Sequence, residues 1–554
     1  MTGESGSAGV QNTFWLLVGV AFGAIITAAL SLLIVDFVRG DAPRSAGGTP
    51  LFVEEAGSAG VEHTYGGEFQ FFVGGGAAVF DCNGDRFPDL YLAGGANPAS
   101  LYVNQSSVAG HLEFDRQFSD STDLVDVTGA YPLDVDSDGL EDLVVLRVGE
   151  NMILRGLGDC EFAPANDDLG INGGDDWTVA FSAKWESGEE MPTMVYGNYL
   201  ASAEPGERDA CATHDLLTPT QEGYRRVELA PGWCTLSALF SDWSATGQQD
   251  LRLTNDRHYY RTGQEQLWQV AAGEAPALYT SNDGWANMQI WGMGIASHDV
   301  TGDGLPEVFL TSQGDNKLQT LADGPEQPTY VDIALGAGVN AHRPFVGDTD
   351  RPSTAWHAEF ADLNNDAFID LFVTKGNVDD IAEFAMDDPN NLLLGQPNGK
   401  FTEAAIDAGL LDYARSRGAA LADLNLDGML DVVVIERREP AKIWRNTGTD
   451  GDRPGGNWLA VDIEQDAPNR NAIGAWVEVR LGNTTLRKEL TVGGGHAGGQ
   501  VGWIHFGLGA ASAAELRVLW PDGEVGPWMT APVNQFAIID RGSSGVTPWV
   551  PVRN

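Results

Sequence analysis

One nine-residue pattern recurs along the chain and constrains its fold more than any other feature. Its clearest copy is Asp134-Val-Asp-Ser-Asp-Gly-Leu-Glu-Asp142, with Asp at positions 1, 3, 5 and 9 and Gly at position 6. An apolar run, Leu143–Leu146, follows directly. Four carboxylates this close repel one another unless a cation lies between them, and Ca²⁺ takes six to eight oxygen ligands. Gly at position 6 permits the sharp turn that brings position 9 round to close such a cage.

Four further clear copies and a weaker one at Asp242–Asp250 place acids or other oxygen donors at the same positions. An EF-hand loop begins with the same spacing of acids, but it ends in Glu at position 12 and lies between two helices. Here each loop is followed by an apolar run typical of a β-strand, so an EF-hand is not expected. For any single loop the alternative is a solvated turn without metal, but copies in register favour about four to six bound Ca²⁺ ions with a structural role. The predicted ligands are Asp81, Asn83, Asp85, Asp89, Asp134, Asp136, Asp138, Asp142, Asp242, Ser244, Thr246, Asp250, Asp299, Thr301, Asp303, Glu307, Asp362, Asn364, Asp366, Asp370, Asp423, Asn425, Asp427 and Asp431.

The spacing of these loops predicts the architecture. The loops begin near residues 81, 134, 242, 299, 362 and 423, and Lys184–Val195 fills a seventh place without the carboxylates. The mean spacing of about 57 residues is in the range of propeller blades with insertions. One such sheet cannot bury both of its faces alone, so seven units stacked in a ring make the core. We therefore predict an all-β chain with a seven-bladed β-propeller over residues 51–450.

Two details agree with a ring of blades. Runs of small residues precede several of the loops, as expected for innermost strands that crowd together near a propeller axis. These runs are Gly74–Ala78, Gly292–Ala296 and Gly418–Ala420. The short apolar segment Phe52-Val53 is a candidate strand that closes the ring against the last blade near Lys442–Arg445.

The pattern changes after a linker that ends near Gly456. Residues 457–541 contain six short alternating runs separated by Gly-rich turns, which predicts a small β-sandwich or barrel, followed by a tail over 542–554. The runs are Trp458–Ile463, Ala475–Arg480, Leu486–Leu490, Trp503–Phe506, Leu516–Trp520 and Phe536–Ile539. The segment Gly493–Gly499 is rich in glycine, but it follows no βαβ pattern, so a phosphate cradle is not expected.

These motifs carry a resemblance to known proteins. The acidic loops resemble FG-GAP and VCBS repeats. More closely, the chain resembles bacterial relatives of cartilage acidic protein, which end in an ASPIC and UnbV domain. The segments that carry the closer resemblance are Trp291–Ala296, Leu310–Leu318, Asp388–Leu394, Asn469–Ala475, Phe506–Gly509 and Val518–Gly523. The resemblance covers about residues 51–541 and implies the architecture rather than an activity.

The N-terminal segment predicts a membrane anchor. Residues 1–13 are polar and lack Lys and Arg, and the 22 residues from Phe14 to Val35 carry no charge. That length spans a bilayer as a helix, here placed over residues 14–36, with a tether over 37–50. A cleaved signal peptide would have a basic n-region and a shorter apolar run, and a buried core helix is the remaining alternative.

Arg39 and Arg44 follow the anchor, which would favour a cytoplasmic C-terminal side. Weak Ca²⁺ sites, however, fill only where Ca²⁺ is millimolar, and long domains cross membranes largely regardless of nearby charge. We therefore expect the bulk of the chain in the periplasm or outside the cell.

Cysteine usage and charge restrict the compartment and the partners. Four cysteines fit two disulfides in an oxidising compartment, with Cys211–Cys234 as the preferred pair and Cys82–Cys160 as the other; four buried thiols are the alternative. The net charge is −47, from 79 acidic and 32 basic residues. Nucleic-acid binding needs a basic surface, so this charge excludes nucleic acid as a partner.

No enzyme motif stands out, which favours a calcium-binding, membrane-anchored module for adhesion or scaffolding with a protein or glycan partner. We expect a long loop over Ser202–Gly232 and a binding surface or a blade strand at Asn255–Tyr260. Trp268, Trp285, Trp291 and Trp356 form either a stacking platform or blade packing. The alternative function is a propeller hydrolase or lyase that acts on saccharide-type substrates, with its site among His258, Trp291, Trp356 and His357. A deep axial pocket lined by histidines and carboxylates would favour this alternative.

Overall fold

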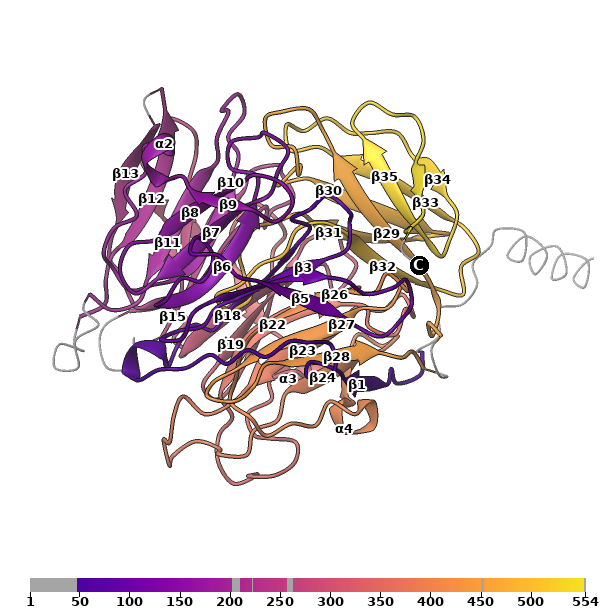
Figure 1. The fold of residues 1–554 in the computed structure, drawn as a ribbon, viewed down its shortest axis with the longest axis horizontal. Coiled ribbons are helices and arrows are strands. Elements are labelled where there is room, and N and C mark those ends of the chain that lie inside the picture. The colour runs from indigo at the N-terminus through magenta and orange to yellow at the C-terminus, as the bar shows by residue number, and fades with distance from the viewer. Residues whose placement is uncertain (1–46, 202–209, 222, 257–262, 450–452, 553–554) are drawn as a thin grey trace, which may run out of the picture.

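The structure is a computed structural model that describes residues 47–201, 210–221, 223–256, 263–449 and 453–552. The predicted anchor over 14–36 and the tail before it lie outside the described residues. Within the described part, no helix is long and apolar enough to cross a membrane. The described chain forms nine four-stranded sheets: seven make the blades of the ring, and two form a separate C-terminal domain, orange to yellow in Figure 1.

The first four blades follow one another along the chain, and each is an antiparallel sheet in chain order. Blade 1 consists of β2 (Ala77–Phe80), β3 (Asp89–Leu92), β4 (Ser100–Asn104) and β5 (Phe114–Gln117). Blade 2 consists of β6 (Val127–Leu133), β7 (Asp142–Arg147), β8 (Met152–Gly156) and β9 (Phe162–Pro164). Blade 3 consists of β10 (Thr178–Lys184), β11 (Thr193–Asn198), β12 (His214–Thr220) and β13 (Gly223–Leu229). Blade 4 consists of β14 (Thr235–Ser241), β15 (Asp250–Asn255), β16 (Gln266–Gln269) and β17 (Ala277–Leu278).

The remaining three blades continue the series, and the last one borrows a strand from the start of the chain. Blade 5 consists of β18 (Gly292–His298), β19 (Glu307–Ser312), β20 (Lys317–Leu321) and β21 (Tyr330–Asp332). Blade 6 consists of β22 (Ala355–Ala361), β23 (Asp370–Lys375), β24 (Asn391–Gly395) and β25 (Phe401–Glu403). Blade 7 consists of β26 (Ser416–Ala422), β27 (Asp431–Glu436), β28 (Lys442–Asn446) and β1 (Phe52–Glu54).

Helical segments in the described residues are single turns between strands. Three of them follow outer strands and end at a glycine with positive φ, which is a common helix stop. The five turns are η1 (Phe69–Phe71), α2 (Asn166–Leu169), η2 (Ser281–Asp283), α3 (Ala334–Ala337) and α4 (Ala405–Ala408).

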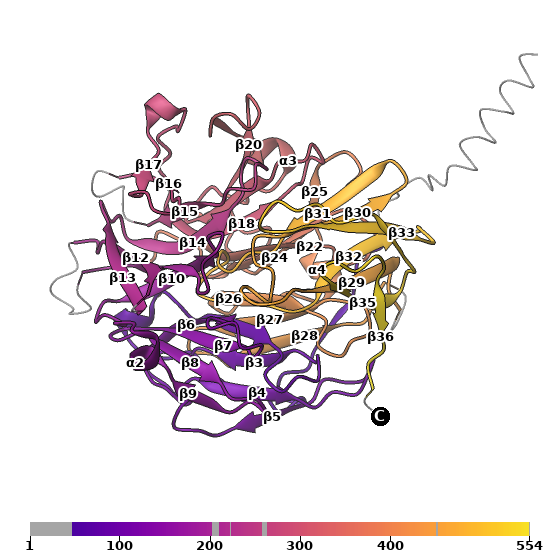
Figure 2. The same cartoon turned by 90° about the horizontal axis from the view of Figure 1, so that it is seen from above.

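The ring closes as the sequence predicts. Strand β1 pairs with β28 in antiparallel register, with Phe52 opposite Asn446 and Glu54 opposite Trp444. The first strands of successive blades contact one another around the ring, and β2 of blade 1 contacts β26 of blade 7. Figures 1 and 2 show the blades arranged around a common centre. The prediction of an all-β chain with seven blades is therefore confirmed.

Two disulfides tie neighbouring blades together, and they are the pairs that the sequence favoured. Cys82–Cys160 joins the first acidic loop of blade 1 to the turn between β8 and β9 of blade 2. Cys211–Cys234 joins the β11–β12 connection of blade 3 to the start of blade 4. Disulfides persist in oxidising compartments, so they indicate an extracytoplasmic protein.

The C-terminal domain is a sandwich of one mixed and one antiparallel sheet, and it is larger than the sequence predicts. One sheet consists of β32 (Ile504–Gly509), β29 (Asn457–Glu464), β35 (Gln535–Asp540) and β36 (Thr547–Trp549). The other consists of β31 (Thr484–Glu489), β30 (Trp476–Leu481), β33 (Ala514–Leu519) and β34 (Met529–Ala531).

The six predicted runs are all strands, but two further strands are present: β34, which the sequence did not predict, and β36, which lies in the segment predicted as a tail. Strand β36 was missed because a three-residue strand shows no alternation, and it is held by the packing of Trp549 against Trp503 and Phe536.

The predicted long loop over Ser202–Gly232 is wrong for most of its described part. Strands β12 and β13 form a hairpin there, with His214 opposite Leu229 and Thr220 opposite Gly223. These are the outer strands of blade 3, and most side chains of β13 remain exposed or half-buried. A polar edge strand lacks the apolar alternation that identifies a half-buried strand, so the sequence did not reveal it.

Candidate functional site

Six acidic loops with one backbone shape form the first part of the candidate site. Each loop joins the innermost strand of a blade to its second strand and is numbered after that blade, so the six are loops 1, 2, 4, 5, 6 and 7. All six lie on one face of the propeller, which we call the loop face. In every loop, positions 4 and 6 have positive φ, even where they are not glycine. These residues are Gly84, Arg86, Ser137, Gly139, Ala245, Gly247, Gly302, Gly304, Asn365, Ala367, Leu426 and Gly428.

The carboxylates at positions 1 and 9 bind backbone N–H groups. In loop 2, Asp134 accepts from the N–H groups of Asp138 (3.0 Å) and Gly139 (2.9 Å). Asp142 accepts from Val135 N–H (2.9 Å) and from Gly156 N–H on the third strand (2.8 Å). Loops 1, 6 and 7 repeat this arrangement at Asp89, Asp370 and Asp431. The position-9 carboxylate, which the sequence analysis placed as the closing ligand of the cage, thus fastens the loop to its own blade.

Positions 1, 3 and 5 of loop 2 bring three carboxylates together. Oxygen atoms of Asp134, Asp136 and Asp138 lie within 4.8 Å of one another, so this triad could hold a metal ion. One oxygen of Asp136 bonds to Arg155 Nε (2.8 Å), whereas its Oδ1 is buried and has no partner among the described residues. Asn425 Oδ1, at position 3 of loop 7, is likewise buried without a partner. Unpaired buried acceptors at position 3 fit a cation in these loops.

Burial makes the ionised form of several loop carboxylates costly. Burial, together with the charges of neighbouring loop acids, raises the pKa of Asp134 to about 6 and that of Asp142 to about 7. Burial also raises the pKa of Asp362 to about 8, with the charge of Asp366 adding to the effect. A cation in such a loop would offset this cost, because it favours the charged form of every carboxylate beside it.

The C-terminal domain lies on the loop face and contacts six of its loops. At loop 1, the guanidinium of Arg86 pairs with Asp462 and with Glu464 (2.6 Å). At loop 2, Asn469 N–H donates to Ser137 Oγ (3.0 Å). The other four contacts are Asp242 N–H to Glu489, Arg487 to Gly304 O, His505 to Asn365, and the packing of Trp458 against Leu426. The acidic loops are therefore also the docking surface for the second domain.

The glycine-rich segment of the C-terminal domain enters the centre of the propeller, and we call Val492–Val501 the plug. It forms bridges with the innermost strands of the first five blades, through Val79, Ala130, Ala183, Leu239 and Ile295. Gly494 N–H donates to Ala238 O, and Gly495 N–H donates to Ile295 O, both at 2.7 Å. A buried segment must pair its backbone groups, and the innermost strands supply those partners.

Glycine at the plug and at the facing strands allows backbones to touch. A Cβ at Gly76 would lie 1.7 Å from Ala497 O, and one at Gly129 would lie 2.1 Å from the same atom. The small residues that the sequence analysis assigned to crowding among inner strands thus also make room for the plug.

His496 is fully buried at the centre of the plug and is satisfied only as a neutral ring. Its Nε2 accepts from Gly74 N–H (3.1 Å), and its Nδ1 donates to Met293 O (2.9 Å). A proton on Nε2 would place one N–H donor against another, the backbone N–H of Gly74, with no acceptor between them. Burial, together with the nearby charge of Arg417, lowers the pKa of His496 to about 3.

Acid should weaken the fold through His496. Because its pKa is lowered in the folded state, its contribution is complete above about pH 6.5 and is lost as the pH falls toward 3. Between pH 7 and pH 5 this loss amounts to about 2 kcal/mol of unfolding free energy for one buried histidine. Denaturant unfolding of His496→Asn should therefore show a smaller decrease between these pH values than wild type. The exposed His342→Asn should retain the wild-type decrease, and equal decreases in all three proteins would contradict the assignment.

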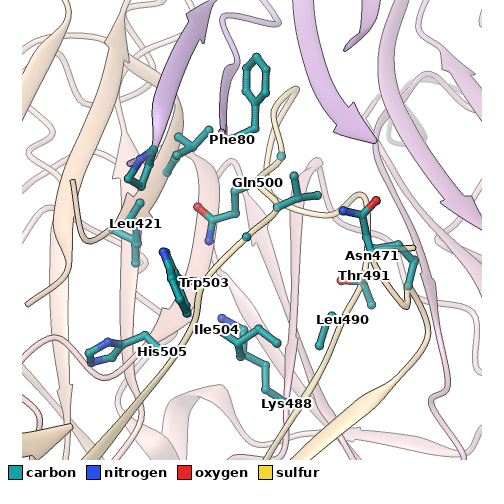
Figure 3. A pocket seen from close by; sticks show the side chains of 18 of the residues that line it. Phe80, Leu421, Asn471, Lys488, Leu490, Thr491, Gln500, Trp503, Ile504 and His505 are labelled. Atoms are coloured by element: carbon teal, nitrogen blue, oxygen red, sulfur yellow. The ribbon is translucent and has the colours of Figure 1, made fainter. Parts of the chain in front are cut away.

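A cavity of about 500 Å³ lies between the loop face and the C-terminal domain. Figure 3 shows Lys488, Gln500, Trp503 and His505 among the side chains that line it. His357, one of the residues named for the alternative enzyme site, also lines this cavity, and its Nε2 lies 3.7 Å from Glu359 Oε2. Sequence reasoning missed the cavity, because its walls come from two domains that show no common motif.

The remaining residues of the predicted aromatic site are dispersed. Trp268, Trp285 and Trp356 are buried in three different hydrophobic clusters of the propeller. Trp291 is half-buried and contacts Phe384 at the face opposite the C-terminal domain. The predicted surface at Asn255–Tyr260 lies largely outside the described residues, including His258.

Comparisons with known structures give distant likenesses. BBS1N in complex with ARL6DN matches with a TM-score of 0.40 and 8% identity, over 72% of this chain and 97% of that chain. The extracellular domain of the putative hybrid two component system BT4673 from B. thetaiotaomicron matches with a TM-score of 0.36 and 7% identity, over 89% and 59%. An Agrocybe aegerita lectin that recognises non-reducing terminal N-acetylglucosamine matches with a TM-score of 0.28 and 13% identity, over 68% and 81%. At such scores these likenesses carry no information about function.

Family models match both parts of the chain. No curated protein matches the sequence. FG-GAP-like repeats match residues 81–145 and 362–434, which contain the acidic loops of blades 1, 2, 6 and 7. An ASPIC and UnbV model matches residues 465–546, within the C-terminal domain. The chain is a β-propeller protein with FG-GAP-like repeats and a C-terminal ASPIC and UnbV domain.

Proposed function

We propose that this chain is an extracytoplasmic, calcium-dependent binding module that presents one propeller face to a protein partner and has no enzymatic activity. The observation that carries the proposal is the position of the C-terminal domain. It covers the loop face, and its plug fills the centre of the ring, so the opposite face is the one that remains accessible. We call this opposite face the open face.

Calcium is the ion that best suits the acidic loops in this proposal. The loops offer only oxygen donors, which hard cations prefer, and the triad of loop 2 has the charge that a divalent ion would balance. Filled loops would stiffen the surface on which the C-terminal domain rests. Calcium would therefore hold the two domains in one arrangement rather than take part in a reaction.

A membrane anchor before the propeller would be compatible with this arrangement. The first described residues lie against loop 6, where Gly47 N–H donates to Asp366 Oδ2 (2.6 Å) and Asn364 donates to Gly48 O (3.2 Å). The chain therefore reaches the propeller on the loop face. A helix over residues 14–36 would tether the module from that side and leave the open face directed toward other molecules.

The open face carries aromatic side chains suited to a protein contact. Phe69, Phe72, Trp291 and Phe384 are half-buried there, at the starts of innermost strands and in the β23–β24 connection. The buried guanidinium of Arg437 lies 4.5 Å from the ring of Phe72 and pairs with Asp379 (2.7 Å), which holds that ring in place. Aromatic side chains are enriched at protein interfaces, whereas lysine and glutamate are depleted.

The alternative of a hydrolase or lyase receives less support. Of its four named residues, the three that the structure describes do not converge: Trp356 is buried, and its indole N–H donates to Gly376 O (2.8 Å), whereas Trp291 lies at the open face. His357 lines the interdomain cavity with Glu359, and that pair is the observation that keeps this alternative in view. Hydrolysis or elimination of a saccharide substrate that is lost in His357→Asn and Glu359→Gln would favour it.

Site-specific photo-crosslinking of the full-length chain in its native cells tests the proposal. A photoreactive residue at position 291 or 384 should capture one defined protein, because both positions lie on the open face. The same residue at the exposed Val525 of the C-terminal domain should not capture it. Absence of a crosslink from both open-face positions, or an equal crosslink from Val525, would contradict the proposed role. Capture of a glycan alone would replace the protein partner by a carbohydrate.

A further inference from the structure

We propose that the cavity between the two domains is a binding site for a small hydroxylated organic anion, such as a sugar acid or hydroxy acid. Six polar residues around the cavity carry the proposal, three from the propeller and three from the C-terminal domain. They are His298, His357, Glu359, Lys488, Gln500 and His505. The inference goes beyond the proposed partner-binding role and does not depend on it.

Lys488 supplies a positive charge without a partner. It lies on the edge strand β31 and lines the cavity, and it makes no hydrogen bond or ion pair with the described residues. Its neighbours Arg487 and Glu489 are both engaged, with Gly304 O and with Ser241 and Asp242. Burial lowers the pKa of Lys488, which means that its charge is poorly solvated there. An anionic group in the cavity would compensate that cost.

His357 supplies a hydrogen-bond donor beside the carboxylate of Glu359. Its Nδ1 accepts from His496 N–H (3.1 Å), so a neutral ring carries its proton on Nε2. That Nε2 is buried and unpaired at hydrogen-bond distance, since Glu359 Oε2 is 3.7 Å away.

Two acceptors from the C-terminal domain are buried without donors. Gln500 donates its amide to Glu359 Oε1 (2.6 Å), and its own Oε1 has no partner. His505 Nε2 lies 2.6 Å from Asn365 Oδ1, whose amide group already donates to Gly428 O. His505 must therefore donate through Nε2, which leaves the lone pair of Nδ1 unpaired.

Eight carboxylates line the cavity, and all of them except Glu359 are engaged with partners other than Lys488. Asp81, Asp134 and Asp423 accept from backbone N–H groups of their own loops. Asp462 and Glu464 pair with Arg86, Glu489 accepts from Ser241 and Asp242, and Glu141 accepts from Asn471 (2.6 Å). Glu359 accepts from Gln500 and is the carboxylate whose charge acts on Lys488.

The donors Lys488 and His357 and the acceptors Gln500 and His505 indicate which chemical groups a ligand would carry at each of its two ends. An ammonium and an imidazole N–H call for an anionic group, whereas an unpaired amide oxygen and an imidazole lone pair call for hydroxyl donors. A cavity of about 500 Å³ has room for a molecule of monosaccharide size. A carboxylate on a hydroxylated carbon frame satisfies both ends at once, and neither a simple sugar nor a simple anion does.

Isothermal titration calorimetry on the purified full-length chain tests this inference, with D-glucuronate as the probe. We expect one glucuronate per chain, and binding weaker by about tenfold or more for D-glucose, acetate and inorganic phosphate, each of which lacks one end of the match. Lys488→Met should weaken glucuronate binding by a similar factor, since it keeps the length of the side chain and removes the charge. Lys400→Met, at an exposed lysine outside the cavity, should bind as wild type does.

The outcomes separate the inference from its alternatives. No glucuronate binding to wild type, or equal binding to Lys488→Met, would overturn it. Equal binding of acetate or phosphate would show a simple anion site and would also overturn it. Thermal unfolding shows whether each variant is folded. If Lys488→Met does not fold, His298→Phe provides the second variant. His298 lines the cavity near the charge of Lys488, and Phe removes its polar atoms while retaining a ring against Phe360. Unchanged glucuronate binding in His298→Phe would count against the inference.

Discussion

Gly76→Ala should lower the unfolding free energy by about 3 kcal/mol, the upper part of the range for inserting a methyl group into a packed core. The added Cβ would lie 1.7 Å from Ala497 O and 2.3 Å from its carbonyl carbon, and both are backbone atoms that cannot rotate away. Gly76 does not have a positive φ, so the loss would come from the contact with the plug and not from backbone strain. Denaturant unfolding measures the loss.

Hydrogen exchange distinguishes displacement of the plug from general destabilisation. In wild type, the amides of Gly494 and Gly495 donate to inner strands and should exchange slowly. Gly76→Ala should increase their exchange more than that of amides in the outer strands. Gly336→Ala is the matched control, because a Cβ there meets no atom within 4 Å and its φ is not positive. If the two variants lose the same stability, or if Gly494 and Gly495 stay protected, the plug contributes less than this structure implies.

Removal of calcium should produce the second large effect. A ligand present at about a hundred times its Kd stabilises the folded state by about 2.7 kcal/mol for each site, so a chelator should lower the melting temperature strongly. Asp138→Ala should reduce this calcium-dependent increment, because it removes one carboxylate of the triad in loop 2. The measure is the difference in melting temperature between calcium and chelator. The melting temperature alone is not suitable, because Asp138 also accepts from Leu140 N–H (2.8 Å), and loss of that hydrogen bond lowers stability with or without calcium.

Removal of calcium should loosen the interface between the domains as well as lower the stability of the fold. The Asn469 amide bonds to Ser137 within loop 2, so a chelator should accelerate its hydrogen exchange. Asp120→Ala, at an exposed aspartate outside the loops, should keep the full calcium-dependent increment. A melting temperature that does not change between millimolar Ca²⁺ and chelator would mean that the acidic loops are metal-free turns.

Much of the fold could be predicted because each blade repeats a local pattern. The nine-residue loop, the apolar strand after it and the spacing between copies are all encoded within one blade. Closure of the ring through Phe52 was also predictable, since a short apolar strand near the start of the chain could pair with the last blade. The outer hairpin at β12 and β13 and the three-residue strand β36 escaped, because polar or very short strands leave no period in the sequence.

The candidate site divides in a similar way. The sequence located the acidic loops, and loop geometry then assigned positions 1 and 9 to different tasks. Nothing in Gly493–Gly499 marked it as a plug, because glycine runs are common in turns and its partners lie hundreds of residues away. Lys488 and His505 looked like surface residues of ordinary strands. They gain the proposed binding role only because docking of the C-terminal domain encloses them opposite His357 and Glu359.

The sequence by itself determined the repeats, the number of blades and the oxygen-rich loops, since these follow from local spacing and composition. Only the tertiary structure decided that the loop face is covered, that the centre of the ring is filled, and that a polar cavity lies between the domains. Those features depend on which surfaces meet, and the meeting is fixed by shape and by hydrogen bonds between distant segments. A pattern of neighbouring residues contains no record of such contacts.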